Sequence, residues 1–242
     1  MAGVAAAGLV AVPAAGGPAA ERTFSQSTRL YEFTYAYPAA AAAIPALRAR
    51  FEAELRTELA KLRGEAREGE AAARENGFPY NPYMRSQRWA VVAALPGWLS
   101  LSAELADYTG GAHGNHGFAA LLWDKRAGRA RRVVDLFVSR AALAAALRTP
   151  FCAALDRQRA TRRGAPVDRA SGDPFDACID PTEQVVILGS RGKQAFDRIG
   201  VLVGPYAAGP YVEGDYEVTL PVTPAVLAAV RPEFRQSFVV AR

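Results

Sequence analysis

Apolar and polar positions repeat along the chain with two different periods, and each period predicts a type of element. Every second residue from Tyr31 to Tyr37 is aromatic, which is typical of a strand, and Pro38 ends that strand. From Ile44 to Leu62 large apolar side chains recur every three or four residues, which predicts one long amphipathic helix. The charged positions that follow extend this helix to Asn76-Gly77, a typical helix end.

Shorter apolar runs in the rest of the chain predict an antiparallel meander, a second helix and three further strands. Pro79 and Pro82 exclude a helix at 78–83, because proline lacks an amide donor and restricts the residue before it. Ser139 is a good N-cap for the second helix, in which Pro150 would cause a kink or break. Strands are expected at 28–37, 88–95, 98–108, 118–124, 131–134, 185–188, 199–203 and 216–220, with a Pro96-Gly97 hairpin and a short helix at 224–230.

These elements interleave without a regular βαβ rhythm. The expected fold class is therefore α+β, with antiparallel sheet or sheets packed against one long and one or two shorter helices. After the first 20 positions no run of about 20 uncharged apolar residues occurs, so we expect no membrane-spanning helix in the folded part.

The net charge of the chain and its distribution bear on whether the protein binds nucleic acid. The net charge of the 242 residues is +5, and it comes from 26 Arg and 3 Lys against 24 acidic residues. A nucleic-acid-binding protein would concentrate this charge in one stripe, whereas the one local excess here, from Arg148 to Arg169, has the small residues of a solvated connection. We therefore expect no nucleic-acid partner.

The first 20 residues and the two cysteines bear on the compartment. Met1 to Ala20 carries no charge and is similar to the apolar and cleavage regions of an export signal that lacks its basic leader; a disordered Ala/Gly tail is the alternative. Cys152 and Cys178 match no metal or redox motif. In an exported chain a disulfide between them is favoured, and in a cytosolic chain they are two small buried residues.

The most unusual string is the glycine-rich loop, Thr109 to Gly117, which follows Asp107 and Tyr108 and contains His113 and His116, the two histidines of the chain. Glycines allow positive φ and a close approach of the backbone to a ligand. His113, His116 and Asp107 could bind zinc in a hydrolase, but a loop fixes no common face for them. The pattern favours a tight structural turn, with no metal and no cofactor.

Signals for other catalytic chemistry are missing, so an enzyme is the less favoured interpretation. The sequence has no nucleophile elbow and no dinucleotide fingerprint, and Gly189 to Lys193 has the wrong spacing for a phosphate loop. Glu213 and Asp215 stand in a turn before a strand, where carboxylates are usually solvated. We assign no catalytic residue.

Aromatic residues in loops are the other candidates for function. Tyr80 and Tyr83 lie between and after prolines, and Tyr206 and Tyr211 bound a Gly/Pro-containing segment, Tyr206–Tyr211, here called the tyrosine loop. Flat amphipathic rings on loops can stack on sugars or anchor a protein partner. Alternatively, these rings cover the edge of the core.

Several strings together resemble a known family. They are Tyr108–Asn115, the turn Lys125–Gly128, Val134–Phe137, Ile199–Gly209 and Glu217–Pro221. The resemblance is to the domain-of-unknown-function family found in the extracytoplasmic part of the anti-sigma factor RsiV and in front of the catalytic part of the peptidoglycan deacetylase PdaC. It implies an α+β domain outside the cytoplasmic membrane without established catalysis, and RsiV-like members bind lysozyme.

This resemblance divides the chain into a truncated export signal or tail at 1–27, a PdaC-like subdomain at 28–108 and an RsiV-like C-terminal subdomain at 109–242. The expected function is a non-catalytic binding or sensing module of the bacterial cell envelope, periplasmic or otherwise extracytoplasmic. Its ligand would be peptidoglycan, another glycan or a lysozyme-like protein. The candidate binding residues are Tyr108, Thr109, Gly110, Gly111, His113, Asn115, Tyr206 and Tyr211.

Overall fold

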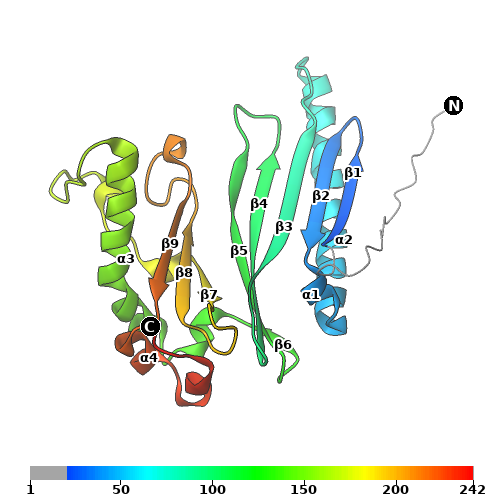
Figure 1. Cartoon of the computed structure of the whole chain (residues 1–242). Coiled ribbons are helices and arrows are strands. Elements are labelled where there is room, and N and C mark those ends of the chain that lie inside the picture. The colour runs from blue at the N-terminus through cyan, green and yellow to red at the C-terminus, as the bar shows by residue number, and fades with distance from the viewer. Residues whose placement is uncertain (1–20, 242) are drawn as a thin grey trace. The chain divides into compact units, whose positions relative to one another are not determined.

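The computed structural model describes residues 21–241 and has an α+β fold (Figure 1). A six-stranded sheet has the order β1-β2-β3-β4-β5-β6, and a three-stranded sheet has the order β7-β8-β9. The expected fold class is confirmed. The strands are β1 (Arg22–Ser27), β2 (Tyr31–Tyr37), β3 (Tyr83–Ala94), β4 (Trp98–Tyr108), β5 (Asn115–Asp124), β6 (Arg129–Arg131), β7 (Val185–Gly189), β8 (Arg198–Val203) and β9 (Tyr216–Pro221). The α-helices are α1 (Ala39–Ala42), α2 (Pro45–Glu75), α3 (Arg140–Arg163) and α4 (Pro224–Ala229).

The chain forms two compact units. The first contains the described residues up to Ala90 together with Ala103–His116, and the second contains Val91–Ser102 and the residues from Gly117 onward. Each unit is described by itself below. Residues 1–20 of the predicted leader or tail, 1–27, lie outside the described residues. Between residues 21 and 241, no helix has both the length and the apolar character that a membrane crossing requires.

In the first unit, the long helix α2 lies along the strands that precede and follow it (Figure 1). Its apolar stripe is buried as the periodicity predicts, and Phe51 is fully buried at the centre of the stripe. The Phe51 ring contacts Tyr35 and Tyr37 of β2 and Trp89 of β3, with centroid distances of 6.5, 5.2 and 5.2 Å. The aromatic face of β2 therefore packs against the helix.

Glycine at position 69 lets α2 approach β3 closely. A Cβ atom at Gly69 would collide with the phenol ring of Tyr83, the first residue of β3. Glycine in the middle of a helix lowers helix stability by about 1 kcal/mol relative to alanine. Here that loss accompanies a close contact between α2 and β3.

Two features of the first unit differ from the sequence expectation. Strand β1 occupies Arg22–Ser27, inside the segment 1–27 that we assigned to a leader or tail. Its side chains are exposed or half-buried, so it has no apolar alternation, and it is held by antiparallel pairing with β2. Strands β2 and β3 pair in parallel, with Tyr35 opposite Gln87, because α2 carries the chain back to the same end of the sheet.

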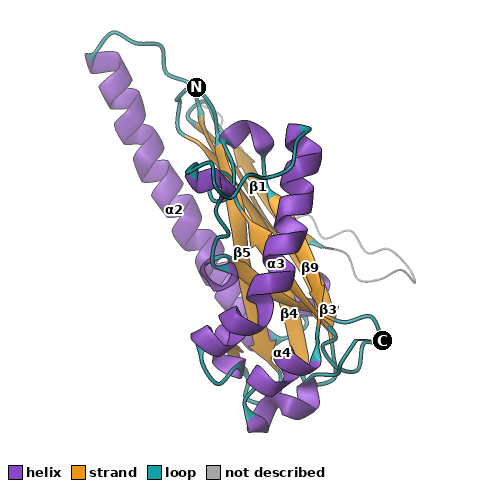
Figure 2. Cartoon of the chain, turned by 90° about the vertical axis from the view of Figure 1, so that its left-hand side faces the viewer, coloured by secondary structure: helices purple, strands orange, loops and turns teal. Residues whose placement is uncertain are grey.

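In the second unit, α3 packs on the three-stranded sheet and contacts β9 (Figure 2). Ser139 caps the helix as expected, since its side chain accepts a hydrogen bond from the amide of Ala142 at 3.0 Å. The helix continues through Pro150 without a break. A proline inside a helix costs about 3 kcal/mol, and burial of the apolar stripe outweighs that cost. The stripe consists of Leu143, Leu147, Phe151 and Leu155, all fully buried.

The remaining strands and α4 confirm the sequence pattern, with one local correction. The segment expected as a strand at 131–134 is divided between β6 and a 3-10 helix, Val133–Leu136. The carboxylate of Asp135 accepts a hydrogen bond from the Arg132 amide at 3.3 Å, which starts this turn. The Pro96-Gly97 hairpin is confirmed by the hydrogen bond from the Leu95 amide to the Trp98 carbonyl at 2.9 Å.

Candidate functional site

The tyrosine loop connects β8 to β9 in the second unit and presents apolar side chains to solvent. Tyr206 has a φ of 64°, a left-handed conformation that is unusual for a residue with a side chain. The residue is 54% exposed, and its ring pairs with the ring of Tyr211 at a centroid distance of 5.5 Å. Val212, the next residue, is 90% exposed. The two predicted tyrosines therefore lie together, beside an exposed valine.

Arginines in the last turns of α3 hold this loop and the residues that follow it. The Nε atom of Arg159 donates to the carbonyl of Ala208 at 2.9 Å. Arg162 donates to the carbonyls of Glu213 and Asp215. Because a guanidinium has several donors in one rigid plane, each of these contacts fixes the direction of the loop backbone as well as its position.

Glu213 connects the loop to α3 through its carboxylate. Arg163 donates to it from Nε at 2.8 Å, and the hydroxyl of Tyr216 donates to it as well. Burial raises the pKa of Glu213, but the hydrogen bonds from Arg163 and Tyr216 outweigh burial and hold its pKa below the ordinary value. A Cβ atom at Gly209 would collide with the Glu213 carboxylate, so the loop also needs a glycine here.

Acidification is expected to destabilise the second unit through this carboxylate. Because the pKa of folded Glu213 lies below its ordinary value of 4.5, its contribution to stability is complete above that pH and is lost as pH falls through the folded pKa. Glu213→Gln should therefore flatten the fall in the free energy of unfolding between pH 7 and pH 3, whereas Glu217→Gln on the exposed face of β9 should not. Equal slopes for the two variants would contradict this role of Glu213.

A disulfide joins Cys152 of α3 to Cys178, with a Cα–Cα distance of 5.5 Å. The segment between α3 and Cys178 is also held by charge, since Arg163 donates to the carboxylate of Asp176 at 2.7 Å. Arg163 thus bridges Asp176 on one side and Glu213 on the other. The same helix end therefore orders two loops, the 164–178 segment and the tyrosine loop.

The glycine-rich loop forms the tip of the β4–β5 hairpin. Gly110 has a φ of +83°, and a Cβ atom at Gly114 would lie 3.0 Å from the carbonyl oxygen of Asp107. The Nδ1 atom of exposed His113 lies 2.8 Å from the Gly114 carbonyl oxygen. Tight backbone geometry thus accounts for two glycines, and a ring nitrogen of His113 contacts local backbone. The other candidate binding residues of the loop (Tyr108, Thr109, Gly111 and Asn115) lie on its two strand ends and tip, and their predicted role in binding stays a prediction.

The metal-site alternative gains no support from this geometry. Among residues 21–241, no three His, Cys, Asp or Glu side chains are grouped so that they could hold a metal ion. His113, His116 and Asp107 are therefore not assembled as the ligand set that a hydrolase would need. That alternative remains a prediction from the sequence alone.

Tyr80 and Tyr83 have structural contacts in the first unit. Their rings pair at a centroid distance of 5.5 Å, and the Tyr80 hydroxyl donates to the Leu30 carbonyl at 2.7 Å. The Tyr83 ring lies against Gly69. These two tyrosines cover the edge of the core, which is the second of the two alternatives that the sequence left open.

The second unit also contains a hollow of about 500 Å³ that no sequence pattern predicts. Its walls combine the aromatic rings of Trp98 and Phe234 with polar side chains, including Gln194, Gln236 and Arg131. The Arg131 guanidinium lies 5.1 Å from the centroid of Phe234 and donates to Asp124 at 2.7 Å. Three turns, strand β6 and the C-terminal 3-10 helix contribute the lining residues. Because these residues are far apart in the sequence, no local sequence pattern predicts the hollow.

The comparisons with known proteins agree with this architecture. Residues 24–116 match the family model described as Deacetylase PdaC. The chain therefore contains a PdaC-like domain, and the resemblance inferred from the sequence is confirmed. A search of curated proteins finds no match.

Two solved structures of DUF3298-family proteins are similar to this chain. A DUF3298-family protein from Bacteroides fragilis NCTC 9343 is 18% identical, with a TM-score of 0.56 over 84% of this chain and 89% of that chain. A DUF3298-family protein from Pseudomonas aeruginosa PAO1 is 15% identical, with a TM-score of 0.47 over 93% and 99% of the two chains. The likeness to the first of these shows a shared fold.

Proposed function

We propose that this protein is a non-catalytic binding or sensing module of the bacterial cell envelope, located outside the cytoplasmic membrane. Its ligand is peptidoglycan, another glycan or a lysozyme-like protein, and the tyrosine loop is its main contact surface. The PdaC-like segment and the disulfide support this location, because disulfides persist in oxidising compartments.

The observation that carries the proposal is a pair of aromatic rings, exposed Tyr206 and half-buried Tyr211, on a loop that is already ordered. Binding by a mobile loop loses affinity to the entropy of ordering, at about 0.5–1.5 kcal/mol for each immobilised side chain. Here Arg159 and Arg163 both donate to the Ala208 carbonyl of the loop, and Tyr206 keeps a left-handed conformation. Backbone strain of this kind is typical of functional sites, where the surrounding structure maintains it.

The chemistry of the exposed tip fits both classes of ligand. Tyrosine is enriched among the residues that dominate binding energy in protein interfaces. Its flat ring also packs on the apolar faces of sugars while the hydroxyl bonds to water or ligand. The hollow beside Trp98 and Phe234, with its amide and guanidinium groups, offers further polar contacts for a glycan.

Tyr206→Ala and Tyr211→Ala are each expected to weaken binding about thirtyfold, because an aromatic anchor at a contact surface contributes about 2 kcal/mol. The measurement is retention of the purified full chain by insoluble peptidoglycan sacculi and by immobilised lysozyme. Phe78→Ala is the matched control, since Phe78 is 70% exposed and lies in the first unit.

The expected result is that the chain binds one of the two ligands, with a selective loss in the Tyr206 and Tyr211 variants. If neither ligand retains the chain, or if Phe78→Ala weakens binding as much, the proposal is wrong.

A further inference from the structure

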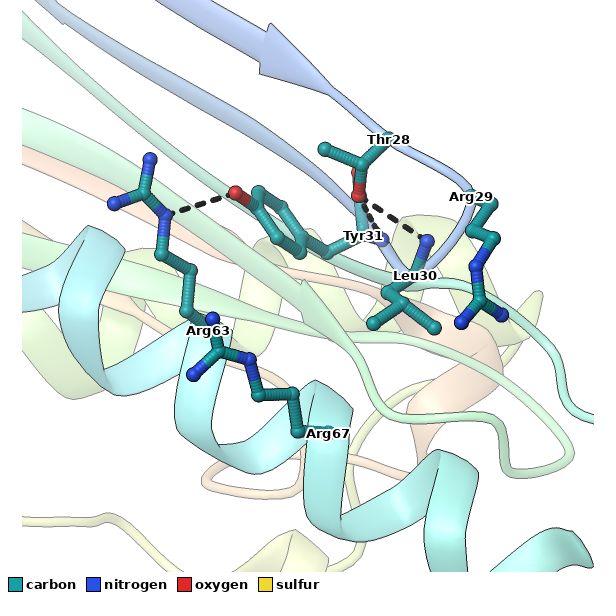
Figure 3. A pocket seen from close by; sticks show the side chains of 6 residues that line it. All are labelled: Thr28, Arg29, Leu30, Tyr31, Arg63 and Arg67. Carbon is teal, nitrogen blue, oxygen red and sulfur yellow. Dashed lines mark hydrogen bonds between the residues drawn. The ribbon is translucent and has the colours of Figure 1, made fainter. Parts of the chain in front are cut away.

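A second hollow, of about 380 Å³, lies in the first unit between the β1–β2 turn and helix α2. Figure 3 shows Arg63 and Arg67 extending from the helix, and Arg29, Leu30 and Tyr31 on the chain opposite. Thr28 completes the lining. Three of the six lining residues are thus arginines, and nothing described above uses them.

The turn that forms one wall is fixed by its own hydrogen bonds. The hydroxyl oxygen of Thr28 accepts from the amides of Leu30 and Tyr31, both at 3.1 Å. The Leu30 carbonyl accepts from the Tyr83 amide at 3.0 Å and from the Tyr80 hydroxyl at 2.7 Å. This wall is therefore formed before any ligand arrives.

Arg63 is held in place by acceptors that do not neutralise its positive charge. Its Nε atom donates to the Tyr31 hydroxyl at 2.9 Å, and one terminal nitrogen donates to the side-chain oxygen of Gln26 at 2.7 Å (Figure 3 shows the first). Both acceptors are neutral. Arg85 of the same unit shows the contrast, since it is paired with two carboxylates, Glu58 at 3.2 Å and Glu65 at 2.8 Å.

The hollow as a whole carries an excess of positive charge. Arg67 is exposed and makes no ion pair with any residue between 21 and 241. Arg63 and Arg67 also stand four residues apart on the same helix, and a like-charged pair at this spacing destabilises a helix. Arg29 pairs with Glu70 at 3.0 Å and is 75% exposed. Three guanidinium groups against one carboxylate leave two positive charges.

We propose that this hollow binds a phosphate monoester, with the phosphate on Arg63 and Arg67 and the organic part of the ligand on Leu30 and Tyr31. Arg29, which Figure 3 shows beyond Leu30, adds to the positive charge of the hollow. A phosphate monoester carries close to two negative charges at neutral pH and offers several acceptor oxygens. Guanidinium groups match these oxygens in geometry, and bonds between ionised partners are roughly twice as strong as neutral ones. A ligand with a carboxylate carries one negative charge and would neutralise only half of the excess positive charge of the hollow. This inference is independent of the tyrosine loop.

The test uses NMR titration of the full chain with phenyl phosphate, inorganic phosphate and benzoate. Phenyl phosphate should shift the backbone amide signals of Leu30, Tyr31, Arg63 and Arg67 and bind more tightly than the other two probes. Inorganic phosphate has the charge without the ring, and benzoate has the ring with one charge. Equal binding by all three probes, or shifts elsewhere in the chain only, would overturn the assignment.

Arg67→Gln should weaken phenyl phosphate binding about tenfold, the loss expected for one charge-assisted contact. Arg56→Gln is the matched control, because Arg56 is an exposed arginine of the same helix that does not line the hollow. Since Arg67 has no structural partner in the described chain, its variant should keep the amide spectrum of the folded protein. An equal loss in both variants would show a general charge effect in place of a site.

Discussion

Arg159→Ala is expected to lower the free energy of unfolding by about 3–4 kcal/mol, as removal of a buried hydrogen-bonding side chain leaves unpaired groups and a cavity. Arg159 is fully buried, and it donates to the carbonyls of Ala208 at 2.9 Å and Ala177 at 3.0 Å. Ala208 is itself fully buried, so water does not replace the lost donor there. Chemical denaturation monitored by tryptophan fluorescence measures the change.

Two further variants separate the causes. Arg159→Met keeps much of the side-chain volume but supplies no donor, so about half of the loss should remain. Arg148→Ala removes an exposed arginine from the same helix and should change stability by less than about 0.5 kcal/mol. If Arg159→Met were as stable as the unchanged protein, the hydrogen bonds to the two loops would contribute nothing and this account of the loop would fail.

Loss of the disulfide is expected to lower the free energy of unfolding by about 3 kcal/mol. The bridge joins cysteines 26 residues apart, and without it the unfolded chain regains the entropy of that loop. The double variant Cys152→Ala, Cys178→Ala and the reduced protein should both show this loss. Because the bridge anchors the segment that Arg163 and Asp176 also hold, proteolysis should begin between residues 164 and 178.

Thiol titration of the unfolded chain under non-reducing conditions provides the control. Protein purified from an oxidising compartment should show no free thiol. Two titratable thiols in that preparation would contradict both the bridge and the proposed extracytoplasmic location. Addition of a reductant to the double alanine variant should leave its stability unchanged, which assigns the effect to this bridge.

The periodicity of apolar residues predicted the helices that bury one face. The stripe around Phe51 gave α2, and the four-residue spacing from Leu143 gave α3, because burial of one helix face is encoded locally. The parallel pairing of β2 and β3 was missed, since alternation shows which face of a strand is buried and not which strand lies beside it. Strand β1 was missed because it is a polar edge strand.

The candidate sites were predicted in part. Aromatic residues in a Gly/Pro-containing loop predict Tyr206 and Tyr211, and their pairing follows from the turn that brings them together. Arg159 was missed, although it continues the four-residue spacing of the buried stripe from Leu155, which was an available signal. The arginine hollow was missed because Arg29 is far in sequence from Arg63 and Arg67, and only the packing of α2 on the sheet unites them.

The absence of a side chain at Gly69 has a consequence for the longitudinal position of α2. If the helix moved by one turn along the strands in either direction, Glu65 or Ala73 would replace glycine opposite the Tyr83 ring, and a Cβ atom there would overlap the phenol. A shift of the helix by one turn would therefore require the Tyr83 ring to move. The present register also determines that Arg63 and Arg67 lie opposite the β1–β2 turn.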